Sequence, residues 1–476
     1  MVIKIGLEIH CQLTGLQSKL FCSCYCDYRA KQPNTNICPI CCGLPGTLPL
    51  LNRMAVNFAY MISIALGCKV QDKIIFYRKN YFYLDLPKNF QITQYNAYGI
   101  TSIGVDGKLE YNGGNARIRR IQLEEDPGRL VYENDDTNTS FYTLIDYNRA
   151  GVPLVEIVTE PDFTDPKDVR VFLNKITSIL EHLGVCNTKL EGSVRCDANV
   201  SVDKDRRVEI KNVSSFREVE RALSYEIARQ KTMSIHNIEI KTETRHWDDT
   251  RKVTKQARVK EEEQDYRYFP EPDIPTIILG NEFLTTLKTN MPELPDERKT
   301  RFIIDYKLSE HVAQVLIDNK ELADFFESAV KIYSSPNEIA NWIVTDLLGF
   351  VYDSKEGSLL SGLKIGAKHI AELAKLVDLN TINRSMAKMI LSQMISTGEM
   401  PLQVVERKDA SKIDDRSFIL ESVESMFRSE ESAVRDARQN PKAVNFLLGR
   451  VMQLTKGRVD PKIARELIEA KLSELD

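Results

Sequence analysis

Several short stretches of the chain alternate apolar and charged residues with a period of two, which is the pattern of a β-strand buried on one face only. In the first of them, KIGLEIH, one face carries Ile5, Leu7 and Ile9, and the other carries Glu8 and His10. The stretches SVRCDANVSV and RVEIKN repeat the alternation on either side of a short polar turn, which predicts an antiparallel hairpin. We therefore expect an antiparallel sheet with one apolar face and one charged face.

The charged face collects acidic residues and a histidine at central strand positions. Glu8 and His10 come from the first strand, Glu124 from IQLEED, Glu156 from PLVEIV and Glu209 from RVEIKN. A solvated face is the plain explanation for any one of these strands. Solvated faces usually mix Lys, Thr and Ser, however, so acidic residues from four strands favour a site that holds a divalent cation such as Mg²⁺.

Cysteines crowd into the N-terminal region, since six of the ten lie within the first 41 residues. Two close pairs, separated by thirteen residues, form the arrangement that a tetrahedral zinc ion requires. The expected ligands are Cys22, Cys24, Cys38 and Cys41. Cys26 and Cys42 could replace one or two of them, and an iron–sulfur cluster or a turn-rich loop of reduced cysteines are the alternatives. A site with four protein ligands would be closed and structural.

The chain changes character along its length, which predicts three domains. Residues 1–291 mix strand, helix and turn signals, and helical signals fill residues 296–405 and 410–476. The segment MPELPDERKTRF is expected to be the first linker and ERKDASKIDD the second. The predicted fold class is α+β: an N-terminal antiparallel-sheet cradle domain with a zinc knuckle, then a helical domain and a small helical tail domain.

Two helices are marked at both ends. The first helix is capped by Asn52 and ends at Gly67. The second is capped by Asp165, has Pro166 in its first turn and ends at Gly184. Apolar residues recur at three- and four-residue spacing in both. They are structural elements to which we attach no chemistry.

Charge and hydropathy exclude several classes of protein. The chain has 64 Lys and Arg against 68 Asp and Glu, a net charge of −4, which argues against a uniformly basic nucleic-acid surface. No apolar run approaches the roughly 18 residues of a membrane span, and Glu8 and His10 interrupt the run that a signal peptide would need. We expect a cytoplasmic protein without a membrane partner. Because the sequence has no GxxxxGK[ST] loop and no GxGxxG that opens a helix, a nucleotide would be held through metal ions on the acidic face.

Eight motifs, taken in order, resemble those of the B subunit of the heterotrimeric tRNA-dependent amidotransferase, the GatB family. The resemblance covers nearly the whole chain, because NFLLGRVMQLTKGRVDP resembles the family's C-terminal tail. The total length leaves no room for the domain inserted in the archaeal E-subunit paralogue, which favours the B subunit. The motifs are KIGLEIH, CPICCGLPGTLPLLN, RKNYFYLDLPKNFQITQY, LEEDPGR, DYNRAGVPLVEIVTEPD, EGSVRCDANVSV, EIKNVSSF and DYRYFPEPDIP.

The resemblance implies an ATP-dependent C–N ligase that acts on misacylated tRNA. The side-chain carboxylate of Glu on tRNA(Gln), or of Asp on tRNA(Asn), would be phosphorylated with ATP and Mg²⁺ in the kinase-like cradle domain. Ammonia derived from glutamine would then displace the phosphate to give the amide. A carboxylate is a poor electrophile, so the acyl phosphate supplies the leaving group, and phosphoryl transfer itself needs mainly positioning and cations.

The resemblance also implies roles for individual residues. Those implied to hold magnesium and carry catalysis are Glu8, His10, Glu124 and Glu125. In a strict strand Glu124 and Glu125 face opposite ways, so both can bind one ion only if the strand ends there. Those implied to contact cofactor or substrate are Arg78, Lys79, Glu156, Arg195, Asp197, Glu209 and Lys211. Ordinary cross-strand ion pairs are the alternative for the hairpin residues.

In the family, a separate amidase chain carries the serine–lysine machinery that releases ammonia, and we find no glycine- and serine-rich run of that kind here. We therefore expect two partner chains, the amidase (the family's A subunit) and the small C subunit. Tyr266 and Tyr268 of DYRYFPEPDIP would line a protected ammonia route or simply pack. In the tail, Arg450, Lys456 and Arg458 are expected to reach tRNA phosphates.

Two other functions compete with the ligase. A non-catalytic, zinc-containing tRNA-binding scaffold would bind tRNA through the tail but no nucleotide at the sheet. A DNA-repair or transcription zinc module would need a basic stripe that residues 1–290 do not show, so no DNA partner is expected.

Overall fold

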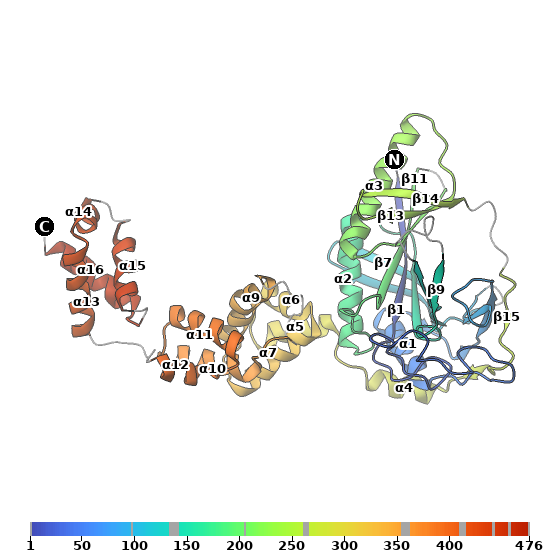
Figure 1. The fold of residues 1–476 in the computed structure, drawn as a ribbon, viewed down its shortest axis with the longest axis horizontal. Coiled ribbons are helices and arrows are strands. Elements are labelled where there is room, and N and C mark those ends of the chain that lie inside the picture. Colours follow the sequence, from blue (N-terminus) through green and yellow to red (C-terminus); the bar gives the residue numbers. More distant parts are fainter. Residues whose placement is uncertain are drawn as a thin grey trace. The chain divides into compact units, whose positions relative to one another are not determined.

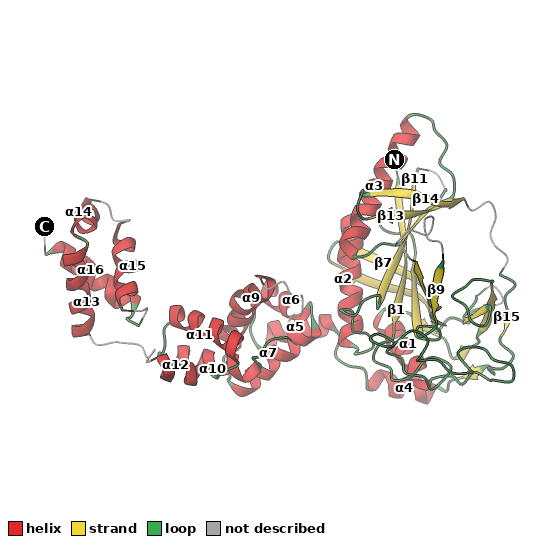
Figure 2. Ribbon diagram, in the orientation of Figure 1, coloured by secondary structure: helices red, strands yellow, loops and turns green. Residues whose placement is uncertain are grey.

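The computed structural model describes residues 2–96, 99–132, 142–203, 206–259, 266–353, 362–408, 416–439, 443–455 and 458–474. The chain forms two compact units, Met1–Glu297 and Arg298–Asp476. The first is built around a large sheet and the second from helices (Figures 1 and 2). The expected α+β class is confirmed. No helix among these residues has the length and apolar content that crossing a bilayer requires.

A nine-stranded sheet forms the body of the first unit, in the order β14-β13-β12-β11-β1-β10-β7-β6-β2. Neighbouring strands are antiparallel except β12 and β13, which are parallel. The long strand β1 lies between β10 and β11. The strands are β1 (Ile3–Gln12), β2 (Lys69–Val70), β6 (Gly104–Tyr111), β7 (Gly114–Glu125), β10 (Pro153–Thr159), β11 (Val194–Val202), β12 (Val208–Lys211), β13 (Glu243–Asp248) and β14 (Val253–Val259).

The period-two alternation predicted for β1 is confirmed. Ile5, Leu7 and Ile9 are buried in the core, and Glu8 and His10 lie on the opposite face with part of their surface exposed. A slip of one residue would exchange the two faces, so burial of the apolar set fixes the register of β1 against its neighbours. Folding of the core thus decides which side chains the other face presents.

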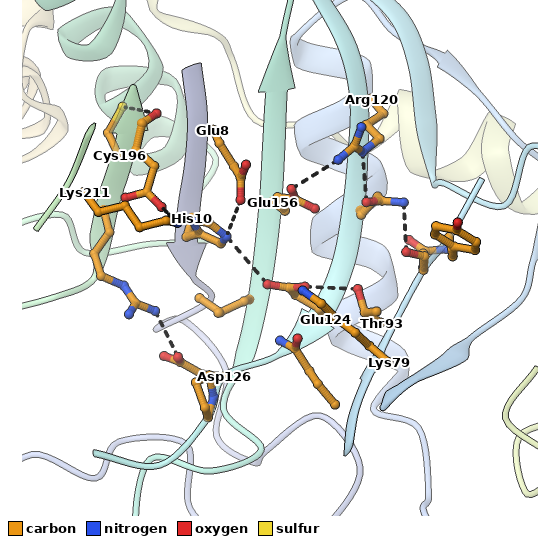
Figure 3. A pocket seen from close by; sticks show the side chains of 18 of the residues that line it. Glu8, His10, Lys79, Thr93, Arg120, Glu124, Asp126, Glu156, Cys196 and Lys211 are labelled. Atoms are coloured by element: carbon orange, nitrogen blue, oxygen red, sulfur yellow. Dashed lines mark hydrogen bonds and ion pairs between the residues drawn. The ribbon is translucent and has the colours of Figure 1, made fainter. Parts of the chain in front are cut away.

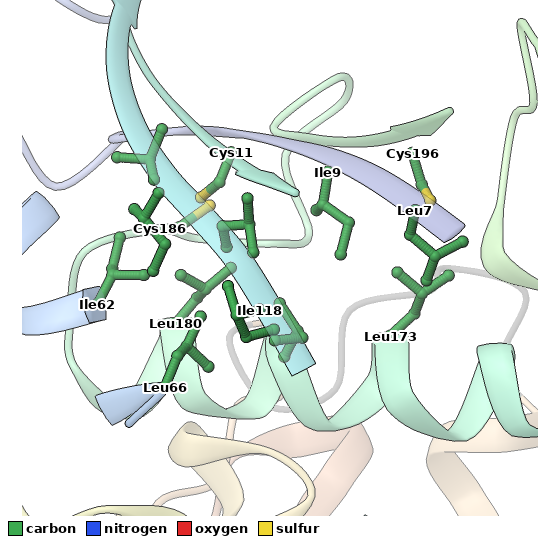
Figure 4. Packing of buried hydrophobic residues seen from close by; sticks show 14 of the residues in the cluster. Leu7, Ile9, Cys11, Ile62, Leu66, Ile118, Leu173, Leu180, Cys186 and Cys196 are labelled. Atoms are coloured by element: carbon green, nitrogen blue, oxygen red, sulfur yellow. The ribbon is translucent and has the colours of Figure 1, made fainter. Parts of the chain in front are cut away.

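Three helices contribute to the core on the apolar face of the sheet. Figure 4 shows Leu173 and Leu180 of α2 and Ile62 of α1 in the same cluster as Leu7 and Ile9 of β1. The predicted caps are confirmed, because the side chain of Asn52 accepts hydrogen bonds at the start of α1 and that of Asp165 at the start of α2. The helices are α1 (Arg53–Ala65), α2 (Pro166–His182) and α3 (Phe216–Ile235).

Smaller elements complete the first unit. A three-stranded sheet, in the order β15-β4-β5, contacts the large sheet through β5 and β7. Two two-stranded sheets, β16 with β3 and β8 with β9, lie elsewhere in the same unit. The elements are β3 (Lys73–Ile74), β4 (Tyr77–Asn80), β5 (Phe90–Thr93), β8 (Arg129–Tyr132), β9 (Thr143–Asp146), β15 (Phe269–Pro270), β16 (Ile277–Ile278) and α4 (Asn281–Thr289).

The second unit is helical and contains two separate hydrophobic clusters, one between Phe302 and Val405 and one between Ile419 and Leu472. The boundary between the two units, after Glu297, falls within the first expected linker, and this part of the chain is helical, since Pro295 begins helix α5. Proline suits the first turn of a helix, where its missing N–H costs nothing. Residues 409–415 of the second expected linker lie outside the described residues.

The elements of the second unit are α5 (Pro295–Asp305), α6 (Glu310–Ile317), α7 (Lys320–Ile332), α8 (Pro336–Asn341), the π-helix η1 (Trp342–Leu347), α9 (Leu348–Asp353), α10 (Ala367–Asp378), α11 (Arg384–Thr397), α12 (Pro401–Lys408), α13 (Arg416–Ser429), α14 (Glu431–Gln439), α15 (Val444–Leu454) and α16 (Pro461–Ser473).

We predict that Phe172→Ala destabilises the first unit by about 3–5 kcal/mol, because Phe172 is fully buried and packs edge-on against Phe163 with ring centroids 5.0 Å apart. Urea unfolding of the full chain, followed by circular dichroism and tryptophan fluorescence, measures the change. Phe82→Ala is the matched control: Phe82 is 84% exposed, so an equal loss in both variants would contradict the prediction.

Candidate active site and cysteine cluster

Strand register places charged side chains in rows across the open face of the large sheet. His10 lies opposite Arg195 of β11 on one side and opposite Glu156 of β10 on the other. In the adjacent row Glu8 lies opposite Asp197. Directly opposed residues of antiparallel strands point to the same face, so the backbone pairing alone gathers residues that are far apart in sequence.

These rows form the floor of a cavity of about 770 Å³ (Figure 3). Its other walls include side chains of β4 and β5, among them Lys79 and Thr93. Most of the side chains expected at the site are here. The expected residues that line the cavity are Glu8, His10, Lys79, Glu124, Glu156, Arg195, Asp197 and Lys211.

One part of the cavity is acidic. His10 Nε2 lies 3.5 Å from Glu8 Oε1 and 3.7 Å from Glu124 Oε1. Ligand atoms of Glu8, His10 and Glu156 all lie within 4.8 Å of one another, a spacing at which one cation could contact all three. The hydroxyl of Thr93 donates to Glu124 Oε2 at 3.0 Å and orients that carboxylate.

Glu156 is the carboxylate in this cluster whose charged form is disfavoured. Burial, together with the neighbouring carboxylates of Glu124 and Glu8, raises the pKa of Glu156 to about 7. Arg120 Nη2 lies 3.4 Å from its Oε1 and offsets part of that cost. A carboxylate in such surroundings favours either a proton or a bound cation.

The structure does not bring Glu125 to this cavity, so its carboxylate lies apart from Glu8, His10 and Glu124. Strand β7 continues through Glu125, so that its side chain faces away from that of Glu124. Its carboxylate is bound by Lys88 Nζ at 2.6 Å and accepts from the backbone N–H of Ile92 at 2.8 Å. Glu156, by contrast, lies beside Glu8 and His10.

Two further expected contacts lie elsewhere. Arg78 forms a two-pronged ion pair with the buried carboxylate of Glu271, at 2.6 and 2.7 Å, and lines a separate cavity of about 300 Å³. Glu209 does not line the large cavity, and its carboxylate accepts from the hydroxyl of Thr244. Glu209 also pairs with Lys211, which lines the large cavity, at 3.3 Å.

The other part of the cavity carries cations that are paired with carboxylates. Arg195 binds the buried carboxylate of Asp126 at 2.9 Å, and Lys211 lies 2.5 Å from Asp197. Nearby carboxylates raise the pKa of Arg195 against the effect of its burial, with Asp126 the strongest influence. The cavity therefore offers cations next to a cluster of carboxylates.

Sequence reasoning missed several lining residues. Arg120 and Gln122 share the period-two face of Glu124 on β7, and that alternation could have identified them. Asp126 follows the strand directly and had no such signal. Tyr95 comes from outside any strand, so only the fold places it here.

The two tyrosines proposed for an ammonia route lie beside this cavity. Tyr268 lines it and stacks on Tyr95, with ring centroids 3.8 Å apart and planes at 5°. The ring of Tyr266 lies 4.8 Å from Lys79 Nζ, a cation–π contact. Packing therefore accounts for both rings, and the route stays a proposal.

Four cysteines converge near the N-terminus of the first unit. The thiol sulfurs of Cys22, Cys24, Cys38 and Cys41 lie within 4.8 Å of one another, and this set can hold a tetrahedral zinc ion. The two spare cysteines fall outside that group. Cys26 Sγ instead contacts the carbonyl of Leu13 at 3.8 Å.

A buried lysine fits a negatively charged metal–thiolate cluster. Lys19 is fully buried, and its ammonium contacts the carbonyl of Asn36 at 2.9 Å and Cys41 Sγ at 3.8 Å. A hydrogen bond from the Cys22 thiol, together with the positive charge of Lys19, lowers the pKa of the Cys41 thiol to about 4. A thiolate at Cys41 gives this buried cation a counter-charge.

Two of the residues expected to contact tRNA, Arg450 and Arg458, lie near the end of the second unit. Arg450 of α15 is about half exposed and pairs with Glu430, Nε to Oε1 at 2.7 Å. Arg458 lies between α15 and α16. Lys456 is outside the described residues.

Comparison with known proteins confirms the family. A family model described as the GatB/GatE catalytic domain matches residues 3–285, and one described as the GatB domain matches residues 324–472. The B subunit of the aspartyl/glutamyl-tRNA(Asn/Gln) amidotransferase of Sulfurisphaera tokodaii is 46% identical over 98% of this chain and 99% of its own length. The B subunits of Saccharolobus solfataricus (45%, over 99% of both chains) and Thermotoga maritima (44%, over 98% of both) are similar along their full lengths too. The chain therefore belongs to the GatB family, the B subunits of aspartyl/glutamyl-tRNA(Asn/Gln) amidotransferases.

Proposed function

We propose that this chain carries the ATP-dependent step in the amidation of Glu-tRNA(Gln), Asp-tRNA(Asn) or both. It would transfer the γ-phosphoryl group of ATP to the side-chain carboxylate of the misattached amino acid. Ammonia from a partner amidase would then attack the acyl carbon, and phosphate would leave as the amide forms. The family supports the amidotransferase role, and the proposal assigns the phosphorylation to the large cavity.

The observation that carries this proposal is the convergence of four ligand-bearing side chains from three strands on one end of the cavity. Glu8 and His10 come from β1, Glu156 from β10 and Glu124 from β7. Carboxylate oxygens and an imidazole nitrogen would hold Mg²⁺ there while water or phosphate oxygens fill the remaining positions. The ion would supply positive charge to the phosphate oxygens of ATP.

The chain's own cations would bind the charges that develop on phosphate. Arg195 and Lys211 line the same cavity as the acidic cluster, with Arg195 paired to His10 across neighbouring strands, and Lys79 reaches it from β4. Phosphoryl transfer depends mainly on such positioning and charge stabilisation. Tyr268 would border the path by which ammonia enters, which keeps the amine away from bulk water and protonation.

The partners follow from the chemistry. Glutamine hydrolysis would be supplied by the amidase, the A subunit, and the small C subunit would complete a heterotrimer. The tail helices would hold the tRNA through Arg450, Lys456 and Arg458. A zinc ion on the four thiols would stabilise the N-terminal loop. That site requires reduced cysteines, so we assign the protein to the cytoplasm.

A scaffold that only binds tRNA is the second candidate. The tail residues favour it equally well, but it gives no role to the acidic cluster in the cavity. Titration of MgATP into the assembled complex separates the two, because a scaffold would not bind nucleotide at the sheet.

We predict that Glu124→Gln lowers the rate of amide formation on misacylated tRNA by about 100-fold, the scale of removing one group that stabilises transition-state charge. Tail-dependent tRNA binding should not change. Glu110→Gln is the matched control, because Glu110 is exposed on the adjacent strand β6. Wild-type rates in Glu124→Gln would remove this residue from the active site, and an inactive wild-type complex would refute the proposed function.

We predict that Glu156→Gln is more stable than the wild type above pH 7 in chelator. The raised pKa of Glu156 means that the folded chain binds this proton more tightly than the unfolded chain, whose glutamate titrates near 4.5. Stability is therefore lost as the pH rises from about 4.5 to about 7, by roughly 1–3 kcal/mol. The variant should lack this loss, and thermal melts between pH 4.5 and 8 measure it.

Added Mg²⁺ should restore wild-type stability at pH 8 and leave Glu156→Gln unchanged, since the proposed ion replaces the lost proton. A variant that is less stable than the wild type at pH 8 without metal would contradict the prediction.

We predict that Cys41→Ser loses bound zinc and Cys42→Ser retains it. The two cysteines are adjacent, but only the Cys41 sulfur lies within the four-thiol group. Zinc content of the purified chain, measured by elemental analysis and by release to a coloured chelator, gives about one ion per chain for the wild type and Cys42→Ser. Loss of zinc from both variants would place Cys42 in the ligand set.

A further inference from the structure

Asp126 lies at the edge of the cavity, but both of its oxygens are already occupied. Its side chain is fully buried. Oδ1 accepts from Arg195 Nη2 at 2.9 Å, and Oδ2 accepts from Gln12 Nε2 at 2.7 Å. A carboxylate engaged in this way is poorly placed to bind a cation in the cavity, so its effect on a ligand must pass through the groups that it holds.

Arg195 is the group through which Asp126 reaches the cavity. Its side chain is 40% exposed and lines the cavity, and it sits opposite His10 in the strand register. Arg149 also lies near Asp126, at 3.7 Å, but its guanidinium donates to the carbonyls of Pro127 and Gly128. Among these neighbours, Arg195 is the cation that Asp126 can aim at a ligand.

The second contact of Asp126 leads to the cysteine-rich loop. Gln12 is almost completely buried, and its Oε1 accepts from Arg29 Nη2 at 2.6 Å. Arg29 lies between Cys24 and Cys38 in sequence and also donates to the carbonyl of Glu191. The hydrogen bonds therefore run without a break from this loop through Gln12 and Asp126 to Arg195.

We propose that Asp126 is a positioning residue that holds Arg195 for a phosphate-bearing ligand, and that Gln12 and Arg29 tether Asp126 to the cysteine-rich loop. This rests on the proposed function in one respect, the use of Arg195 as a phosphate contact. Charge-assisted hydrogen bonds fix geometry more strongly than neutral ones, so the tethered carboxylate keeps the guanidinium in one place before the ligand arrives.

The test is a double-mutant cycle on the full chain, with magnesium pyrophosphate as the probe and isothermal titration as the measurement. We expect Arg195→Ala and Asp126→Asn each to weaken binding about tenfold. The double variant should bind no more weakly than Arg195→Ala alone, because Asp126 acts only through Arg195. A merely structural role would instead give losses that add.

The matched control is Glu226→Gln, which removes a fully buried carboxylate whose partner Arg229 does not line the cavity. It should bind the probe as the wild type does. Gln12→Met keeps the charge of Asp126 and removes one tether, so we expect a loss of about threefold. This variant also serves if Asp126→Asn fails to fold.

Four results would overturn the proposal: no binding of the probe by the wild type, unchanged binding by Arg195→Ala, unchanged binding by folded Asp126→Asn, or losses that add in the double variant. Failure of the proposed function is a separate outcome. A complex that forms no amide, while the cycle behaves as expected, refutes the ligase and leaves the positioning role in place.

Discussion

Like charges held together on one face of a sheet are the constraint on which this structure depends. Glu8, Glu124 and Glu156 share one end of a cavity, and the strands that carry them bury a continuous apolar core on the other face. The core fixes the strand register, so the carboxylates cannot move apart by a slip of the strands. Burial, together with repulsion from Glu124 and Glu8, raises the pKa of Glu156. The fold thus holds these carboxylates in an electrostatically unfavourable arrangement, and binding a proton or a cation would reduce their repulsion.

The alternation within each strand made much of this face predictable. Ile5, Leu7 and Ile9 could be assigned to the core from their spacing, and Glu8 and His10 then had to lie on the opposite face. The order of the strands could not be read in the same way. That β1 lies between β10 and β11 is a property of the whole sheet, so the sequence suggested the site's residues without showing which would be neighbours.

Glu125 and Arg78 were expected at the large cavity but lie elsewhere. Each forms an ion pair with a residue that is distant in sequence. Lys88 forms an ion pair with Glu125, 37 residues away, and Glu271 forms one with Arg78, 193 residues away. No local pattern announces such pairs, because the attraction exists only after the segments fold together. The helix that begins at Pro295 was not expected, for a local reason. Proline breaks a helix when it is in the interior and is favoured in the first turn, so the same sequence is compatible with a linker or with the start of a helix.

The two proposed metal sites differ in what they leave open. Four thiolates close a zinc ion completely, so the only effect available to it is on the position of the loop. The acidic cluster supplies oxygen and imidazole ligands from one side and leaves the other side to the ligand. Arg29 belongs to the closed site's loop, and its bond to Gln12 continues to Asp126 and Arg195. Hydrogen bonds therefore join the loop of the proposed zinc site to Arg195, a cation that lines the large cavity.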